Sequence, residues 1–112
     1  MIERILQDHL SRNAYPCYLS MPEQPSGSFC IIQKTGSDLK DGLFSATLAV
    51  QSYGKTKLET AQMNHKIVQT MLEAVTLPQI SACDLNTDYD YPDTTRKLPR
   101  YQAIFDVTYY DD

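Results

Sequence analysis

The sequence lacks several features on which common protein functions depend. It has no tryptophan and only four glycines, and its three cysteines are an odd number without the C-x-x-C spacing of zinc sites. We therefore expect Cys17, Cys30 and Cys83 to be buried thiols rather than disulfide partners or metal ligands. No apolar run approaches the roughly 18 residues that span a bilayer, so no membrane association is expected.

Positive charge is also scarce. Ten lysines and arginines stand against fourteen aspartates and glutamates, which gives a formal net charge of −4. Binding to a nucleic-acid backbone depends on clustered basic residues, and here only Arg96, Lys97 and Arg100 lie close together. The sequence therefore predicts repulsion from DNA. Tyrosine, in contrast, is abundant at eight copies, and its amphipathic ring suits wet interfaces as well as sheets.

Catalytic signatures are missing. Nucleophilic catalysis needs a base beside the nucleophile, but His9 and His65 lie in expected helices, far in sequence from the three cysteines. No cleft-building loops accompany the carboxylates, as glycoside chemistry would require. We therefore expect a protein that is not an enzyme and that carries no cofactor and no metal.

The stretch Gly54-Lys55-Thr56 matches the end of a phosphate-binding P-loop. That loop needs a glycine five residues before its Gly-Lys pair, and Ala49 occupies the position. Thr56 and Glu59 instead match the T-x-x-E capping box. The stretch is therefore predicted to be the junction between a strand and the first turn of a helix.

Apolar periodicity indicates the order of elements. Helical stripes cover residues 2–13 and a stretch of about five turns that follows Thr56 and stops near Pro78. Strand patterns cover residues 29–33, 44–51, 83–91 and 101–109, with a short edge strand within residues 17–21. The expected fold is a single α+β domain, residues 1–112, in the order α-β-β-α-β-β. An antiparallel sheet of about four strands would carry both helices on one face.

The connection over residues 35–43 is long and polar for a hairpin. Its glycines and charged residues are Gly36, Asp38, Lys40, Asp41 and Gly42. Long polar loops are usually functional or disordered, so we predict a mobile docking element that becomes ordered on contact with a partner.

Residues 83–91 alternate between packed and acidic side chains. One parity holds Cys83, Leu85, Tyr89 and Tyr91, and the other holds Asp84, Asn86, Asp88 and Asp90. A regular strand would place these acids on one solvent-facing surface. Pairing with the last strand is expected to put Asp90 opposite Arg100, and Leu85 opposite Phe105. The acidic string also resembles the start of a calcium loop, but it lacks the glycine at the sixth position and the glutamate at the twelfth.

Two stretches carry a resemblance to a known family: ATLAVQSYGKTKLETAQMNHKIVQTM, residues 46–71, and CDLNTDYDYPDTTRKLPRYQAIFDVTYY, residues 83–110. With the short opening helix and the proline-rich segment after it, they resemble the tail-completion, or tail terminator, proteins of long-tailed phages and prophages of Gram-positive bacteria. The resemblance covers nearly the whole chain. The family has no catalytic motif that could be matched residue by residue.

The resemblance implies a structural subunit of the virion. Such subunits form a ring, typically of six copies, on the head-proximal end of the tail tube, and a free subunit can be a monomer. The implied partners are further copies of the chain, the tail tube protein and the head connector, and the implied location is the virion tail after assembly in the host cytoplasm. DNA would pass through the ring without specific binding, and we predict that Asp84, Asp88 and Asp90 line the channel. The alternative is a small dimeric module that binds a metabolite or calcium.

Overall fold

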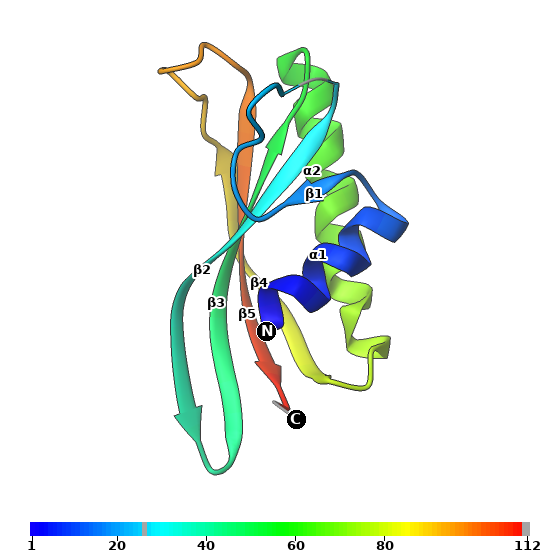
Figure 1. Cartoon of the computed structure of the whole chain (residues 1–112), viewed down its shortest axis with the longest axis vertical. Helices are drawn as coiled ribbons and strands as arrows, with labels where there is room; N and C mark the ends of the chain where they lie inside the picture. Colours follow the sequence, from blue (N-terminus) through cyan, green and yellow to red (C-terminus); the bar gives the residue numbers. More distant parts are fainter. Residues whose placement is uncertain (26, 111–112) are drawn as a thin grey trace.

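The computed structural model describes residues 1–25 and 27–110, and its central feature is a five-stranded sheet with the helices on one face (Figure 1). The elements are α1 (Ile2–Asn13), β1 (Cys17–Tyr18), β2 (Phe29–Lys40), β3 (Leu43–Tyr53), α2 (Lys57–Leu72), the 3-10 helix η1 (Glu73–Thr76), β4 (Ile80–Asp90) and β5 (Arg100–Tyr109). The predicted α+β class is confirmed. Within the described ranges, no helix is both long and apolar enough to cross a membrane.

The strands lie in the order β1-β2-β3-β5-β4. All neighbours are antiparallel except β1, which runs parallel to β2. The sheet is therefore mixed and has five strands, whereas we expected about four antiparallel ones. The connection over residues 19–28 is too long for a tight hairpin, and it returns the chain to the end of the sheet at which β1 began.

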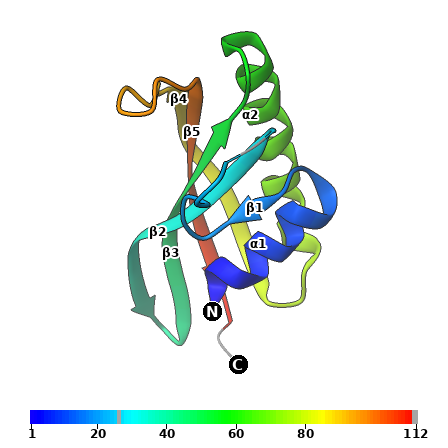
Figure 2. The same cartoon turned by 45° about the horizontal axis from the view of Figure 1, so that its top comes forward.

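The core lies between the sheet and the two helices, which cross the same face (Figure 2). Ile2, Leu6 and Leu10 of α1 pack there against fully buried side chains of the sheet such as Leu48 and Phe105. Along α2 the buried positions include Thr60, Met63, Ile67 and Met71. Leu58, one of the apolar residues from which this helix is predicted, is 70% exposed.

The junction between β3 and α2 explains the Gly-Lys-Thr stretch. Thr56 is the N-cap of α2, and its hydroxyl accepts a hydrogen bond of 3.1 Å from the backbone N–H of Glu59, so the predicted cap is confirmed. The Glu59 carboxylate accepts a hydrogen bond from the Ser28 hydroxyl. It therefore does not return to the backbone N–H of Thr56, as a complete capping box would require. A Cβ at Gly54 would lie 2.6 Å from Oγ1 of Thr60, so this glycine allows the helix to begin directly against the strand.

The prediction of a mobile loop over residues 35–43 is wrong. β2 and β3 remain paired as far as Lys40 and Leu43, and only Asp41 and Gly42 form the turn. Both have positive φ, 55° and 82°, as a type I′ turn requires. Asp-Gly is a preferred sequence for this turn, so the polar residues extend a ribbon and do not form a loose loop. Gly36 and Asp38 lie in this ribbon, and the side chain of Lys40 lies outside the described part of the structure.

Candidate interaction site

The acidic side chains of β4 do not share one face, contrary to the prediction. The pairing with β5 skips Asn86 at a bulge between Leu85 and Thr87, and this extra residue reverses the parity of the strand beyond it. Leu85 lies opposite Phe105 as predicted, but Asp90 lies opposite Tyr101 and not Arg100.

Asp88 and Asp90 consequently turn toward the helices. Oδ2 of Asp88 accepts a hydrogen bond of 2.8 Å from the amide of Asn64 on α2. Oδ2 of Asp90 lies 3.2 Å from Nζ of Lys57 in the first turn of the same helix. These two carboxylates therefore help to hold the edge strand against α2 and do not form part of a continuous acidic surface.

Asp84 remains on the open face of the sheet. Its register partner is Asp106 on β5, and residues directly opposite each other lie on the same face. Asn86 donates a hydrogen bond of 3.0 Å to Oδ2 of Asp106. Asp84 and Asp106, both exposed, are thus the acids that face outward on this side of the sheet.

A buried aspartate organises the loop between β4 and β5. Asp93 is only 4% exposed, and Oδ2 accepts from the Tyr53 hydroxyl at 3.0 Å and from the Arg96 guanidinium at 3.1 Å. Oδ1 accepts from the backbone N–H of Arg96 at 3.1 Å. Arg100 donates to the Tyr53 hydroxyl at 3.2 Å and lies over the Tyr91 ring, 4.1 Å from its centroid. We call Asp93, Tyr53, Arg96 and Arg100 the Asp93 cluster.

The surroundings of Asp93 change its protonation equilibrium. Burial by itself raises the pKa of this carboxyl, but hydrogen bonds from Arg96 and Tyr53 and the charge of Arg100 outweigh burial and lower the pKa below its ordinary value. The carboxylate is therefore charged at neutral pH, and its charge holds the loop against the sheet.

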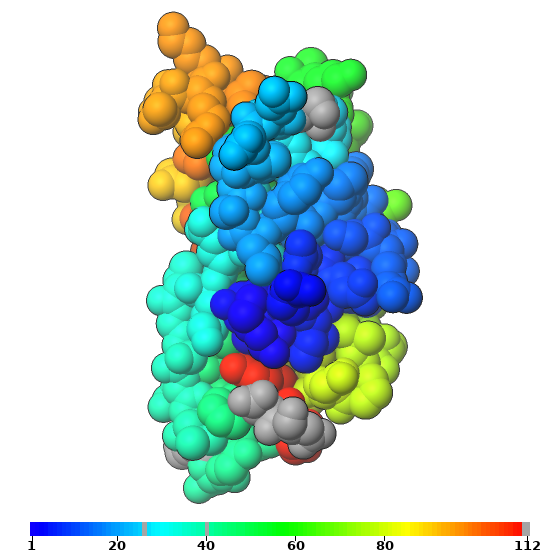
Figure 3. Space-filling model, viewed as in Figure 1, coloured from blue at the N-terminus to red at the C-terminus, as the bar shows by residue number. Residues whose placement is uncertain are grey.

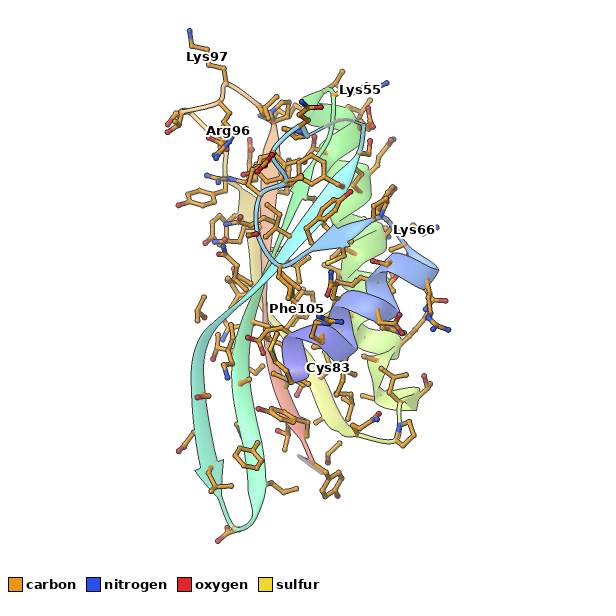
Figure 4. The ribbon with its side chains drawn as sticks, in the orientation of Figure 1. Lys55, Lys66, Cys83, Arg96, Lys97 and Phe105 are labelled. Atoms are coloured by element: carbon orange, nitrogen blue, oxygen red, sulfur yellow. The ribbon has the colours of Figure 1, made fainter. Side chains whose placement is uncertain are left out.

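A cavity of about 510 Å³ opens between this loop and the first turn of α2. Its apolar wall includes Pro92, Leu98, Pro99 and Tyr101. Two lysines and two aspartates also line it: Lys57, Lys97, Asp90 and Asp93. Lys97 extends from the tip of the loop, and Arg96 and Lys55 lie at the same end of the molecule (Figure 4). We call this the upper cavity.

The cysteines are free and buried, as predicted. Burial, together with the nearby charge of Asp84, raises the pKa of Cys83 to about 12. A hydrogen bond with the Cys17 thiol, followed by burial, raises the pKa of Cys30. These two thiols are therefore protonated at neutral pH and are poor nucleophiles.

Within residues 1–25 and 27–110, no group of three or more His, Cys, Asp or Glu side chains is placed to hold a metal ion. No family model matches the chain, and no curated protein sequence matches it significantly.

The sequence did not indicate the upper cavity or the Asp93 cluster. Asp93 lies in the connection between the two predicted strands over residues 83–91 and 101–109, and nothing in its local sequence distinguishes it from Asp90. The backbone N–H of Arg96 donates to the side chain of Asp93 three residues earlier, which is the geometry of a helix N-cap and not of an Asx turn. The partner that makes Asp93 important, Tyr53, lies far away in sequence.

Proposed function

We propose that the chain is a non-enzymatic structural subunit of a phage virion that assembles into a ring at the head-proximal end of the tail tube and joins the tail to the head connector. The sequence resemblance suggests this role. The observation that carries it is that the subunit has two long, unlike surfaces on opposite sides of its sheet. One is the free edge of β4, and the other is the β2–β3 ribbon.

The first surface is the outer edge of β4. This strand is last in the sheet, and its residues from Asp84 to Asp90 are all exposed. A free strand edge offers unpaired backbone groups to another chain. Leu85, at 37% exposed, and Tyr89, at 41%, add apolar area to this edge.

α2 and η1 both contact β4, and we propose that their exposed apolar side chains form a strip beside its edge. Asn64 contacts Asp88, and Leu85 lies about 10 Å further down the strand at roughly 3.3 Å per residue. The same distance corresponds to about seven residues of helix, which leads from Asn64 to the level of Met71, the residue before Leu72. Leu72 and Val75 are 41% and 47% exposed. The strip therefore supplies the apolar contact that a backbone pairing alone lacks.

The second surface is the β2–β3 ribbon, which forms the lower end of the molecule (Figure 1). It contains the residues we predicted to dock, now arranged as a paired ladder. A ring of identical subunits with cyclic symmetry uses two different surfaces that close on each other, and this subunit offers such a pair.

The open face of the sheet is the candidate lining of the DNA channel. Asp84 keeps the role predicted from the sequence, with Asp106 in place of Asp88 and Asp90, because those two contact α2. Converting Asp84 and Asp106 to lysine is expected to make assembled rings retain DNA in a filter-binding assay. The control is Asp8→Lys on the exposed side of α1. Equal DNA release by both variants contradicts the channel position.

The test of the function is assembly onto tail tubes. Purified protein is added to tubes from a phage that lacks its terminator, and electron microscopy is used to look for a ring on one end. We expect capped tubes of arrested length, and loss of capping for Leu72→Asp combined with Leu85→Asp. The proposal is contradicted if the protein leaves tubes uncapped even when they are built from the tail tube protein of its own genome.

The second candidate is a small dimeric module that binds a metabolite or calcium. The upper cavity favours the metabolite, because its volume of about 510 Å³ lies within the roughly 300–1,000 Å³ of small-molecule pockets. The divergence of Asp84 from Asp88 and Asp90 removes the acidic surface that suggested calcium. A calcium-dependent rise in melting temperature, with a dimer as the largest species, would favour this module over the ring.

A further inference from the structure

Two of the three free thiols lie side by side at the edge of the sheet. Cys17 of β1 is the direct register partner of Cys30 in the parallel pairing with β2. Both side chains are buried, at 4% and 0% exposed, and both belong to the core between the sheet and the helices. Directly paired residues of neighbouring strands project to the same face of a sheet, so the two thiols meet inside the core.

The spacing of the two strands suits a disulfide. Neighbouring strands lie about 4.8 Å apart. The Cα atoms of disulfide-bonded cysteines lie roughly 4.4–6.8 Å apart, so the paired backbones already have a suitable separation. The thiols of Cys17 and Cys30 are also close enough to form a hydrogen bond with each other. Neither strand therefore has to move far for the two sulfur atoms to be joined.

Helix α1 holds Cys17 in this position. The backbone N–H of Cys17 donates to the Ser11 hydroxyl at 3.1 Å, and its carbonyl oxygen accepts from the Gln7 amide at 3.0 Å. On the side of β2, the backbone N–H of Cys30 donates to the carbonyl oxygen of Pro16 at 2.9 Å. The backbone around Cys17 is thus fixed by α1 on one side and by β2 on the other.

We infer that Cys17 and Cys30 form a reversible, redox-sensitive disulfide that fixes the edge strand β1 to β2. The inference goes beyond the proposed function and does not depend on ring formation. Under that function, a chain that is assembled in a reducing host cytoplasm and then released with the virion would become oxidised only after assembly.

The edge position of Cys17 gives an oxidant access to the pair. β1 has only two residues, whereas β2 has 12. So short an edge strand is held by few backbone hydrogen bonds and opens locally at low cost. In the space-filling view the N-terminal part of the chain, in blue, lies in the outer layer of the molecule (Figure 3). Cys17 is therefore the thiol that a small oxidant reaches first.

The oxidant in this reaction is a small-molecule disulfide such as oxidised glutathione. The Cys17 thiolate attacks one of its sulfur atoms, the S–S bond breaks, and one glutathione leaves as a thiolate that takes up a proton. The hydrogen bond with the Cys17 thiol is the largest cause of the raised pKa of Cys30, and it is lost in the mixed disulfide. The Cys30 thiolate then attacks the sulfur of Cys17 and releases the second glutathione. The two cysteines lose two protons and two electrons, and oxidised glutathione takes them up.

Oxidation of the full-length protein tests the pair directly. The folded protein is equilibrated with oxidised glutathione at neutral pH, the remaining thiols are blocked in urea with N-ethylmaleimide, and the mass of the chain is measured. We expect a chain that has lost two hydrogen atoms and carries a single blocked thiol, that of Cys83. Cleavage after Met21 with cyanogen bromide separates the two cysteines in sequence, and the two fragments should stay linked until a reductant is added.

Thermal unfolding shows whether the bond stabilises the edge strand. Closing the loop of residues 17–30 restricts the unfolded chain, so oxidation should raise the Tm by about 5–10 °C. Cys17→Ala and Cys30→Ala should each abolish this rise. Cys83→Ala is the matched control, because Cys83 is also buried but lies in β4 at the other end of the sheet, and the rise should be retained. Unfolding of each variant under reducing conditions verifies that it is folded.

The inference is overturned if all three thiols stay free in oxidised glutathione, if the linkage includes Cys83, or if the reaction stops at a mixed disulfide. An unchanged or lower Tm after oxidation also overturns it, because the bond would then not stabilise the edge strand. The mass measurement uses the wild-type chain and needs no tail tubes. Its failure removes the redox pair alone, whereas uncapped tail tubes remove the proposed function.

Discussion

The two hairpins of this sheet are closed in different ways. The β2–β3 hairpin ends in the two-residue turn Asp41-Gly42, and the residues around it are exposed. The β4–β5 hairpin ends in a longer loop that folds over the buried carboxylate of Asp93. One closure depends on backbone conformation and the other on a buried polar cluster. The longer loop is therefore held by tertiary contacts of Asp93, whereas the tight turn is held by the conformation of its own backbone.

The largest effect is expected at the buried carboxylate. Asp93→Asn removes the charge that Arg96 and Arg100 approach and leaves these donors without an anionic partner. We expect a loss of about 2–3 kcal/mol in the free energy of unfolding, measured by urea denaturation at neutral pH. Asp38→Asn in the other hairpin is the control, because Asp38 is exposed, and it should change stability by less than about 0.5 kcal/mol. Similar losses for both variants would remove the distinction between the two closures.

Acid should abolish the difference between wild type and Asp93→Asn. The pKa of Asp93 is lower in the folded chain than its ordinary value, so its stabilising contribution is complete above the unfolded pKa of about 3.9. The contribution is lost as pH falls through the lower, folded value. Urea titrations between pH 6 and pH 2.5 should therefore show the two stabilities converging toward the acidic end. A constant gap across this range would show that the charge of Asp93 is not the cause.

A smaller effect is expected at the tight turn. Gly42 has φ of +82°, where a side chain is strained, so Gly42→Ala should cost about 1 kcal/mol. Gly36→Ala in the same ribbon is the control. Its φ is not positive, and the nearest atom to an added Cβ is Oγ1 of Thr47 at 4.0 Å. That variant should be neutral or slightly stabilising in the same unfolding assay. The reverse order would mean that the turn is not of the type described.

The smallest effect is expected at Lys97, the residue with positive φ in the longer loop. Lys97→Gly relieves the strain of a φ of 58° but adds freedom to the unfolded chain, so the net change should stay within about 0.5 kcal/mol. Lys55→Gly is the matched control at an exposed lysine, and the loss there should approach about 1 kcal/mol. Equal losses at both positions would indicate that the loop does not depend on the backbone conformation of Lys97.

The predictable parts of the fold are those governed by neighbours in sequence. The cap at Thr56, the helix over residues 2–13 and the final strand follow from local periodicity and capping chemistry, and all three are observed. The Asp41-Gly42 turn could also have been predicted, because this dipeptide favours a two-residue hairpin turn. The polar residues around it indicated a loop instead.

The remaining features depend on contacts between distant residues. The bulge at Asn86 has no signature in the sequence, yet it decides which acids face outward and which contact α2. The parallel pairing of β1 arises from the path of residues 19–28, and the importance of Asp93 arises from Tyr53. For the candidate site, the docking role of the hairpin tip and the channel position of Asp84 stay predictions, and the sequence did not indicate the upper cavity.

The most direct test is chemical crosslinking between copies of the chain that have assembled on tail tubes. A zero-length carbodiimide joins carboxylates to amines in contact, and an equal mixture of 14N and 15N protein separates intermolecular from intramolecular products by mass. We predict intermolecular links from Asp38 or Asp41 of the β2–β3 ribbon to Lys57, which pairs with Asp90 at the edge of β4. Only intramolecular links, or intermolecular links that never include these residues, would contradict the account.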